Sequence, residues 1–324
     1  MIELSDIQTP VRENIEHFSK VFNSSLSSDI ELINKMSNYV LTMQGKQMRP
    51  LFLLLSSALH GGVTTQSYYA ATFIELVHTA SLIHDDVVDE AYMRRDKLSV
   101  NALERSKVAV LLGDYVLSRG LRIAVQHELY KTIGMMASVI EQMSMGELLQ
   151  TQHTIKLDIT ADSYFDVIRR KTAVLMATCG AAGATCANGS QDDIDRMYKF
   201  GELLGTAFQI KDDILDYTKT SKTGKITCND IKERKLTLPI IAILEKSNNK
   251  EKRALLSMIR DISSSSKSVE AVRNYVIQHG GIAQAESKME QIKQEAISVL
   301  DFYADSDIKT ALINYADFVL NRTK

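Results

Sequence analysis

The chain has 324 residues, of which 45% are hydrophobic and 24% are charged, so it can bury the core of an ordinary globular protein. Its 38 basic and 40 acidic residues give a net charge of −2, which excludes a general attraction to nucleic acid or to a membrane surface. The longest apolar run, residues 51–55, is too short to span a membrane, and the N-terminus lacks the basic start and apolar stretch of a signal peptide.

Helical patterning recurs along the whole chain. Only 3 prolines and 15 glycines interrupt it, and no alternation of the strand type is sustained. The apolar spacing predicts helices, in chain order, over residues 8–24, 28–43, 50–60, 66–92, 107–127, 131–154, 162–187 and 191–218. A polar loop is predicted at 219–235, an apolar helix from Leu238-Pro239, and three amphipathic helices beyond residue 250. Because the sequence contains no recognisable domain linker, we predict a single domain over residues 1–324. We expect it to be all-α, a bundle of long antiparallel helices.

The three cysteines do not suggest a disulfide framework. Cys179 and Cys186 would lie about 10 Å apart along one helix, which is too far to form a bridge. We expect these two thiols and that of Cys228 to be reduced, in a cytoplasmic protein.

Two acidic motifs stand out against apolar surroundings. Residues 81–90, SLIHDDVVDE, place Asp85 and Asp89 four apart on one helix face, where like charges oppose each other by a few tenths of a kcal/mol. Residues 212–216, DDILD, repeat the spacing. A single such motif is usually a solvated helix face, but two copies inside apolar helices favour a shared ligand. Carboxylate oxygens are the ligands that Mg²⁺ prefers, and several Mg²⁺ ions bound to a diphosphate would offset the repulsion.

Cations and hydrogen-bond donors recur beside both acidic motifs, as a diphosphate site requires. Alone, each would be read as a surface charge or, for the histidine, as a core residue. The candidates are Lys46, Arg49, His78, Arg94, Arg95, Lys171, Thr172, Gln209, Lys225 and Lys235.

These motifs together resemble the trans-isoprenyl diphosphate synthases, or polyprenyl synthetases, and among them the long-chain members such as octaprenyl and heptaprenyl diphosphate synthase. The matching stretches, in the family's order, are GKQMRP, DDVVDEAYMRR, KTAVL, FQIKDDILDY and TGKITCNDIKERKLTLP. Asp96 and Arg234 occupy positions where the family usually has glycine. The resemblance implies helices around a central apolar cavity, with Mg²⁺-dependent transfer of an allylic group to isopentenyl diphosphate. It also implies a homodimer, while the balanced charge predicts no nucleic-acid partner.

The resemblance also assigns roles to the candidate residues. It implies that Asp85, Asp89 and Asp212 are the main ligands of three Mg²⁺ ions held partly by the substrate diphosphate, with Asp86, Asp213 and Asp216 in support. Isopentenyl diphosphate would be bound by Lys46, Arg49, His78 and Arg95. The allylic diphosphate would be bound by Arg94, Lys171, Thr172, Gln209, Lys225 and Lys235, of which Lys171 and Lys225 also count as catalytic.

Product length depends on the helix that precedes the first motif. In the family, bulky aromatic residues four, five or eight positions before the motif block the growing chain, and here those positions hold Ser81, Ala80 and Val77. Val77 lies about 12 Å below Asp85 along a helix, so we predict a long product of roughly seven to nine isoprene units.

Other functions stay open at this stage. The chain could be the catalytic large subunit of a two-component synthase, or a shorter-chain farnesyl or geranylgeranyl synthase. A terpene cyclase would carry a different second motif, and a non-catalytic helical subunit would have lost acids or cations that are present here.

Overall fold

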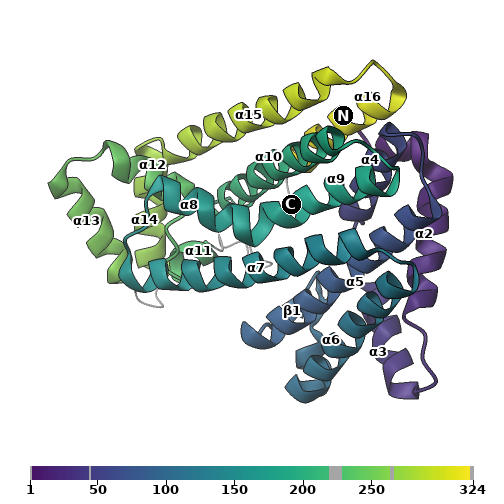
Figure 1. Ribbon diagram of the computed structural model, residues 1–324. Coiled ribbons are helices and arrows are strands. Elements are labelled where there is room, and N and C mark those ends of the chain that lie inside the picture. Colours follow the sequence, from purple (N-terminus) through teal and green to yellow (C-terminus); the bar gives the residue numbers. More distant parts are fainter. Residues whose placement is uncertain (1, 44, 219–227, 263–265, 322–324) are drawn as a thin grey trace. The chain divides into compact units, whose positions relative to one another are not determined.

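The computed structural model describes residues 2–43, 45–218, 228–262 and 266–321. The chain forms two compact units. The first unit comprises Met1–Ala137, Thr178–Tyr198 and Asp305–Leu312, and the second comprises Ser138–Ala177, Lys199–Ala304 and Ile313–Lys324. Within the described residues, helices account for nearly all regular structure, which confirms the all-α prediction (Figure 1).

The first unit holds the N-terminal helices. They are α1 (Leu4–Gln8), the 3₁₀ turn η1 (Thr9–Val11), α2 (Arg12–Ser25), α3 (Glu31–Thr42), α4 (Met48–Leu59), α5 (Thr65–Val88) and α6 (Val100–Gln126). The helix α5 packs against α2, α4 and α6, and runs side by side with α6 (Figure 1). Its N-terminus is fixed by a capping box, in which Thr64 and Ser67 exchange side-chain to backbone hydrogen bonds.

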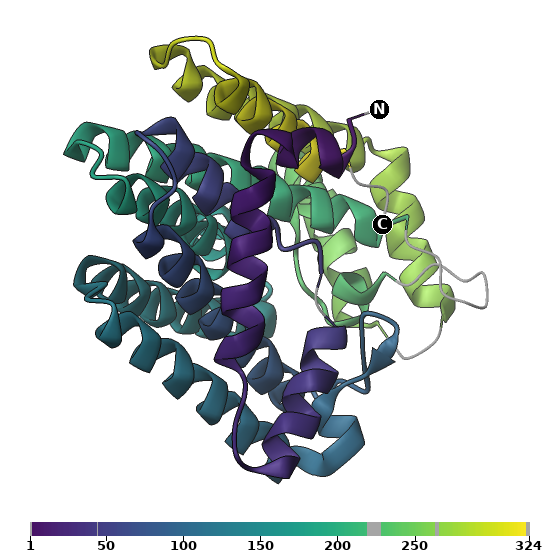
Figure 2. The same ribbon diagram turned by 90° about the vertical axis from the view of Figure 1, so that its right-hand side faces the viewer.

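A short hairpin follows α5 and was not predicted. The strands β1 (Met93–Arg94) and β2 (Lys97–Leu98) pair antiparallel, near α3 (Figure 2), where the hydroxyl of Tyr39 donates to the carbonyl of Leu98 at 2.8 Å. Strands of two residues are too short to show alternation in a sequence. The turn residues Arg95 and Asp96 have φ of 51° and 61°, so both adopt the left-handed conformation that a two-residue hairpin requires.

The second unit holds the helices after the middle of the chain. They are α8 (Ala161–Ile168), the π-helical turn η2 (Arg169–Ala173), α11 (Asn229–Lys232), α12 (Leu238–Lys246), α13 (Asn249–Arg260), α14 (Ser266–Gln278), α15 (Gly281–Val299) and the 3₁₀ turn η3 (Leu300–Phe302). The helix α12 packs on α15 and α8. Helices that contribute residues to both units are α7 (Tyr130–Lys156), α9 (Val174–Cys186), α10 (Gln191–Asp216) and α16 (Asp307–Leu320).

Several predicted boundaries need correction. The helix predicted over 162–187 is divided into α8, η2 and α9, because a π-helical turn leaves no trace in the apolar spacing. Residues 229–232 form one helical turn inside the predicted loop, and the apolar helix predicted from Pro50 begins at Met48. Among the described residues after 248 there are four α-helices rather than three, since α15 and α16 are separate.

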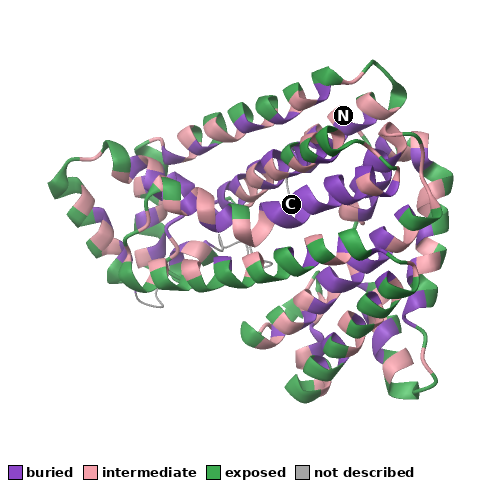
Figure 3. Ribbon diagram, in the orientation of Figure 1, coloured by how far each residue is buried: buried purple, intermediate pink, exposed green. Residues whose placement is uncertain are grey.

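The helix α9 is buried along most of its length (Figure 3), which its small residues allow. A Cβ added at Gly183 would collide with the carbonyl oxygen of Leu53 in α4. In the second unit, a Cβ at Gly205 of α10 would lie 2.7 Å from the Cα of Ala173. Glycine at these positions therefore permits close helix contact. The thiols of Cys179, Cys186 and Cys228 are free, as expected, and all three are buried.

Candidate active site

The first acidic motif divides into exposed and buried carboxylates. Asp85 and Asp89 are exposed, at the C-terminal end of α5, whereas Asp86 is only 2% exposed. The Nε of Arg94 donates to both carboxylate oxygens of Asp86 at 2.8 Å, and its Nη2 lies 2.7 Å from Oδ1. Arg94 is therefore paired with a buried acid of the motif, a contact that was not predicted for a ligand of the diphosphate.

Arg95 is positioned by the segment before α4, at Met43 and Gly45. Its Nη1 donates to the carbonyl of Met43 at 2.7 Å, and a Cβ added at Gly45 would lie 2.8 Å from that same nitrogen. Gly45 thus leaves the space that the guanidinium occupies. Asp96 tolerates the left-handed turn conformation better than most residues, which explains how it can replace the family's glycine.

A cluster of buried polar groups lies in the middle of α5. Burial raises the pKa of Glu75, and nearby Arg49 and Arg95 lower it. Burial, followed by the positive charges of Arg49, Arg95 and Arg94, holds the pKa of His78 well below its usual value, so its imidazole is neutral. Glu75 was missed in the sequence, although its spacing of three from His78 places both on one helix face.

Three buried atoms of this cluster have no hydrogen-bond partner: Nε of Arg49, Oε2 of Glu75 and Nδ1 of His78. Glu75 and His78 line one pocket together with Asp86, Arg94 and Arg95. Unsatisfied buried polar atoms in one place indicate a site that water or a polar ligand completes. Lys46 is exposed before α4 and is not among the residues that line the pocket.

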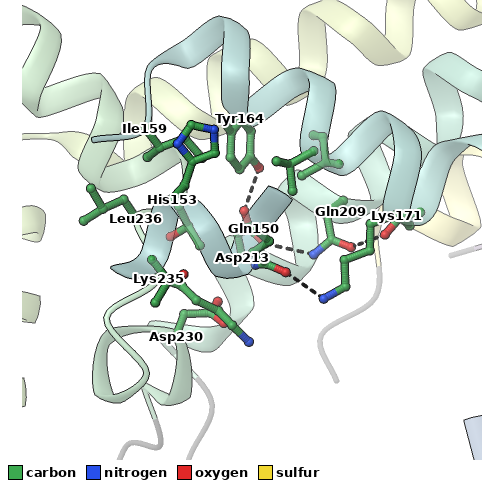
Figure 4. Close-up of a pocket in the computed structure, with 15 residues that line it drawn as sticks. Gln150, His153, Ile159, Tyr164, Lys171, Gln209, Asp213, Asp230, Lys235 and Leu236 are labelled. Carbon is green, nitrogen blue, oxygen red and sulfur yellow. Dashed lines mark hydrogen bonds between the residues drawn. The ribbon is translucent and has the colours of Figure 1, made fainter. Parts of the chain in front are cut away.

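The second acidic motif ends α10 and is held by a chain of hydrogen bonds (Figure 4). The hydroxyl of Tyr164 donates to Oδ2 of Asp213 at 2.6 Å, and Nε2 of Gln209 donates to Oδ1 at 3.0 Å. The hydroxyl of Thr172 in turn donates to Oε1 of Gln209 at 2.7 Å. Burial and then Asp213 raise the pKa of Tyr164 well above its usual value, so the phenol keeps its proton.

Acidic groups are packed closely at this motif. Burial, followed by the charge of Asp230, raises the pKa of Asp213 to about 7. Burial, followed by Asp216, raises the pKa of Asp230 to about 6. The backbone N–H of Asp230 donates to Oδ2 of Asp216 at 2.9 Å. Asp212 is half-buried beside them, and the cluster is one that a cation would stabilise.

Predicted substrate residues of the second unit surround one pocket, of about 110 Å³ (Figure 4). Lys171 and Thr172 come from η2, Gln209 from α10, and Lys235 from the segment before α12. The ammonium of Lys171 donates to Oε1 of Gln150 at 2.7 Å and lies 2.5 Å from Glu147, and Lys235 lies 2.5 Å from Glu233. Lys225 lies outside the described residues. The structure therefore brings together four of the predicted residues.

A sequence model of the polyprenyl synthetase family matches residues 30–276. The chain belongs to this family. Octaprenyl diphosphate synthase of Haemophilus influenzae is 30% identical over 323 residues, covering 99% of this chain and 98% of the relative. Geranylgeranyl diphosphate synthase of Sulfolobus acidocaldarius is 31% identical, covering 96% and 97%. Like them, this polyprenyl synthetase is a prenyltransferase.

Solved structures agree with the family. Polyprenyl synthase from Caulobacter crescentus, complexed with calcium and isoprenyl diphosphate, superposes with a TM-score of 0.90 at 26% identity, covering 99% of this chain and 98% of that one. Decaprenyl diphosphate synthase from Rhodobacter capsulatus gives 0.90 at 28% identity, covering 98% of each chain. The fold is therefore the all-α fold of polyprenyl synthases.

Metal ligands are not assembled within the part of the chain that the structure describes. No group of three or more His, Cys, Asp or Glu there is placed to hold a metal ion. Asp85 and Asp89 belong to the first unit and Asp212 to the second, so their joint role stays a prediction. The described helices also include none long and apolar enough to cross a membrane.

The predicted chain-length residues lie on α5. Val77 and Ala80 are buried, at 6% and 2% exposure, and Ser81 is half-buried with its hydroxyl donating to the carbonyl of His78 at 2.9 Å. No bulky side chain stands at these positions, in keeping with the sequence analysis.

Proposed function

We propose that this polyprenyl synthetase elongates farnesyl or geranyl diphosphate with isopentenyl diphosphate, in a Mg²⁺-dependent reaction. The product would be an all-trans polyprenyl diphosphate of roughly seven to nine isoprene units, because the chain must pass Val77, about 12 Å along α5 from Asp85. The observation that carries the proposal is that each unit groups predicted diphosphate ligands around a pocket beside an acidic motif.

Isopentenyl diphosphate would bind in the first unit. Arg49 and Arg95 supply fixed positive charge beside His78. Lys46, which is exposed before α4, would complete the set. A neutral His78 has one N–H to donate without adding a further charge. The Nε–H of Arg49 has no hydrogen-bond partner, and the substrate would accept a hydrogen bond from it.

The allylic diphosphate would bind in the second unit. Lys171 and Lys235 line the pocket as cations, and Gln209 and Thr172 line it as amide and hydroxyl. Lys225 belongs to the same set by its position in the sequence. Because Arg94 is engaged with Asp86, we propose that it anchors the first acidic motif rather than the allylic diphosphate.

The acidic motifs suit magnesium because their ligands are all oxygens. Asp85, Asp89 and Asp212 would hold the ions together with the substrate diphosphate, and Asp86, Asp213 and Asp216 would keep the motifs in shape. Magnesium, when bound, supplies Lewis-acid stabilisation of the departing diphosphate.

The basic side chains would stabilise the departing diphosphate and hold the second substrate. As the allylic C–O bond breaks, negative charge grows on the diphosphate, and Lys171 and Lys225 would stabilise it, with Lys235 binding the same group. Arg49 and Arg95 would hold isopentenyl diphosphate so that its alkene attacks the carbocation, after which a proton is lost. We assign that proton to the released diphosphate, since no side-chain base is needed.

Product length is the part that the relatives leave open. Octaprenyl and geranylgeranyl diphosphate synthases are about equally similar to this chain, at 30% and 31% identity. The absence of aromatic residues at positions 77, 80 and 81 favours the longer product. A single domain, a homodimer and a cytoplasmic location complete the proposal.

The direct experiment incubates the purified chain with Mg²⁺, farnesyl diphosphate and radiolabelled isopentenyl diphosphate, and separates the products by chain length. We expect label in long polyprenyl products, and none when EDTA replaces Mg²⁺. Arrest at geranylgeranyl diphosphate would identify a shorter-chain synthase. Activity only after a second protein is added would identify the large subunit of a two-component enzyme.

A further inference from the structure

Tyr164 is a buried side chain whose hydroxyl forms a hydrogen bond that the sequence did not predict. It lies in α8, is 3% exposed, and its hydroxyl forms a 2.6 Å hydrogen bond to Oδ2 of Asp213 in α10 (Figure 4). This separation is at the short end of the range for hydrogen bonds between two oxygens. The phenol therefore ties α8 to the last turns of α10.

The bond is the first of a connected series. Oδ2 of Asp213 accepts the hydrogen bond from the hydroxyl of Tyr164, and Oδ1 accepts one from Nε2 of Gln209 at 3.0 Å. The amide oxygen of Gln209 receives the hydroxyl of Thr172 at 2.7 Å. Because Thr172 donates its only O–H to Gln209, its hydroxyl cannot also donate to a ligand in the pocket.

Gln209 keeps a donor for the pocket. A primary amide has two N–H groups, and the hydrogen bond to Asp213 uses one. Because Asp213 and Thr172 hold the two ends of the amide, its orientation is fixed, and the remaining N–H has a defined direction. Tyr164 donates to Oδ2 of Asp213, the carboxyl oxygen that Gln209 does not contact.

We propose that Tyr164 is a positioning residue for the allylic diphosphate: acting through Asp213, it fixes the amide of Gln209, which donates to the diphosphate, while Thr172 serves as support. This inference rests on the proposed function. It differs from a merely structural role, in which Tyr164 would satisfy a buried carboxylate and affect both substrates alike or neither.

The first test is Tyr164→Phe, which keeps the ring and removes the hydroxyl. The KM for farnesyl diphosphate should rise about tenfold, the order of one hydrogen bond to a charged group. The KM for isopentenyl diphosphate should stay unchanged, since that substrate is assigned to the first unit. Equal changes in both KM values, or a change in kcat alone, would overturn the proposal. Tyr275→Phe in α14, whose side chain does not line the pocket, is the matched control and should leave both KM values unchanged.

The second test asks whether Tyr164 acts through Gln209. In a Gln209→Ala background, Tyr164→Phe should no longer raise the KM for farnesyl diphosphate, because the amide that it positions is gone. If the same rise appears in both backgrounds, the two residues act independently and the proposal is wrong. Thermal unfolding of each variant shows whether it is folded.

A binding measurement separates this inference from the proposed function. Calorimetry with a farnesyl diphosphate analogue that carries sulfur in place of the ester oxygen reports affinity without turnover. Wild type that neither binds the analogue nor uses isopentenyl diphosphate would contradict the proposed function. Wild type that binds it, with an equal affinity for Tyr164→Phe, would contradict only the role of Tyr164.

Discussion

At the scale of single residues, the carboxylates of one acidic motif have different environments. Asp85 and Asp89 are exposed, whereas Asp86 is buried and held by three short contacts from Arg94. A buried carboxylate is tolerated only when it is paired, so the pair is a structural requirement of the motif.

Replacing Arg94 with alanine should expose this dependence. The variant leaves Asp86 buried without its partner, and the free energy of unfolding should fall by about 3 kcal/mol. Urea unfolding measures the change. The double variant Asp86→Asn/Arg94→Ala, which removes the stranded charge, should recover part of the loss. A change below about 0.5 kcal/mol, the usual range of a surface substitution, would show that the pair is unimportant.

His78 gives a pH dependence with a definite sign. Its pKa is depressed in the folded protein, while the unfolded chain takes up a proton near the ordinary value of 6.5. As pH falls below that value, protonation therefore favours the unfolded state, by up to about 1.4 kcal/mol per pH unit. Unfolding free energies of wild type and His78→Gln between pH 7 and pH 5 should show a steeper loss for wild type. Parallel curves would contradict a neutral, buried His78.

The sequence was most informative where residue type and spacing coincide. The spacing of the acids drew attention to the cations and polar residues beside them, several of which line a pocket in each unit, together with Asp86 in the first and Asp213 in the second. Glu75 and Tyr164 were missed because a single acid or tyrosine in an apolar helix carries no pattern. Their partners, Arg49 and Asp213, come from other helices, and only the fold brings them close.

At the scale of elements, short irregularities position the site. The π-helical turn η2 carries Lys171 and Thr172, and the hairpin after α5 carries Arg94 and Arg95. Neither has a periodic signature, so long helices were predictable and these elements were not. Close helix packing at α9 was foreseeable from its small residues, although its partners were not.

A matched pair of glycine substitutions tests that packing. Gly183→Ala in α9 would collide with backbone of α4 and should lower the free energy of unfolding by about 1–3 kcal/mol. Gly134→Ala in α7 meets nothing within 4 Å and should instead raise stability by about 0.5–1 kcal/mol, since alanine is the better helix former. Thermal or urea unfolding compares the two. Equal effects would show that Gly183 is not needed for contact.

At the scale of the whole molecule, we propose that product length depends on what the chain places beside α5. The positions assigned to this role hold Val77, Ala80 and Ser81, none of them bulky. The sequence shows these residues but not the end of the cavity, because distant segments would form it. The fold class and the enzyme class predicted from the sequence are confirmed. The product length has not been tested and stays a prediction.

Ser81→Phe tests the wall assignment. A ring at this half-buried position should block the growing chain and shift the product to fewer isoprene units, as chromatography of the labelled products would show. Ser81→Ala, which adds no bulk, should leave the product unchanged. An unaltered product from a folded Ser81→Phe enzyme would remove Ser81 from the wall.

The central claim is that both acidic motifs act in one prenyl transfer. Rates of isopentenyl diphosphate incorporation should be measured for Asp85→Asn and Asp212→Asn, with the exposed Asp162→Asn of α8 as control. Each motif variant should lose at least about a hundredfold in kcat, the scale of removing electrostatic stabilisation from a transition state, while the control keeps its rate. Wild-type turnover in either motif variant would contradict the account.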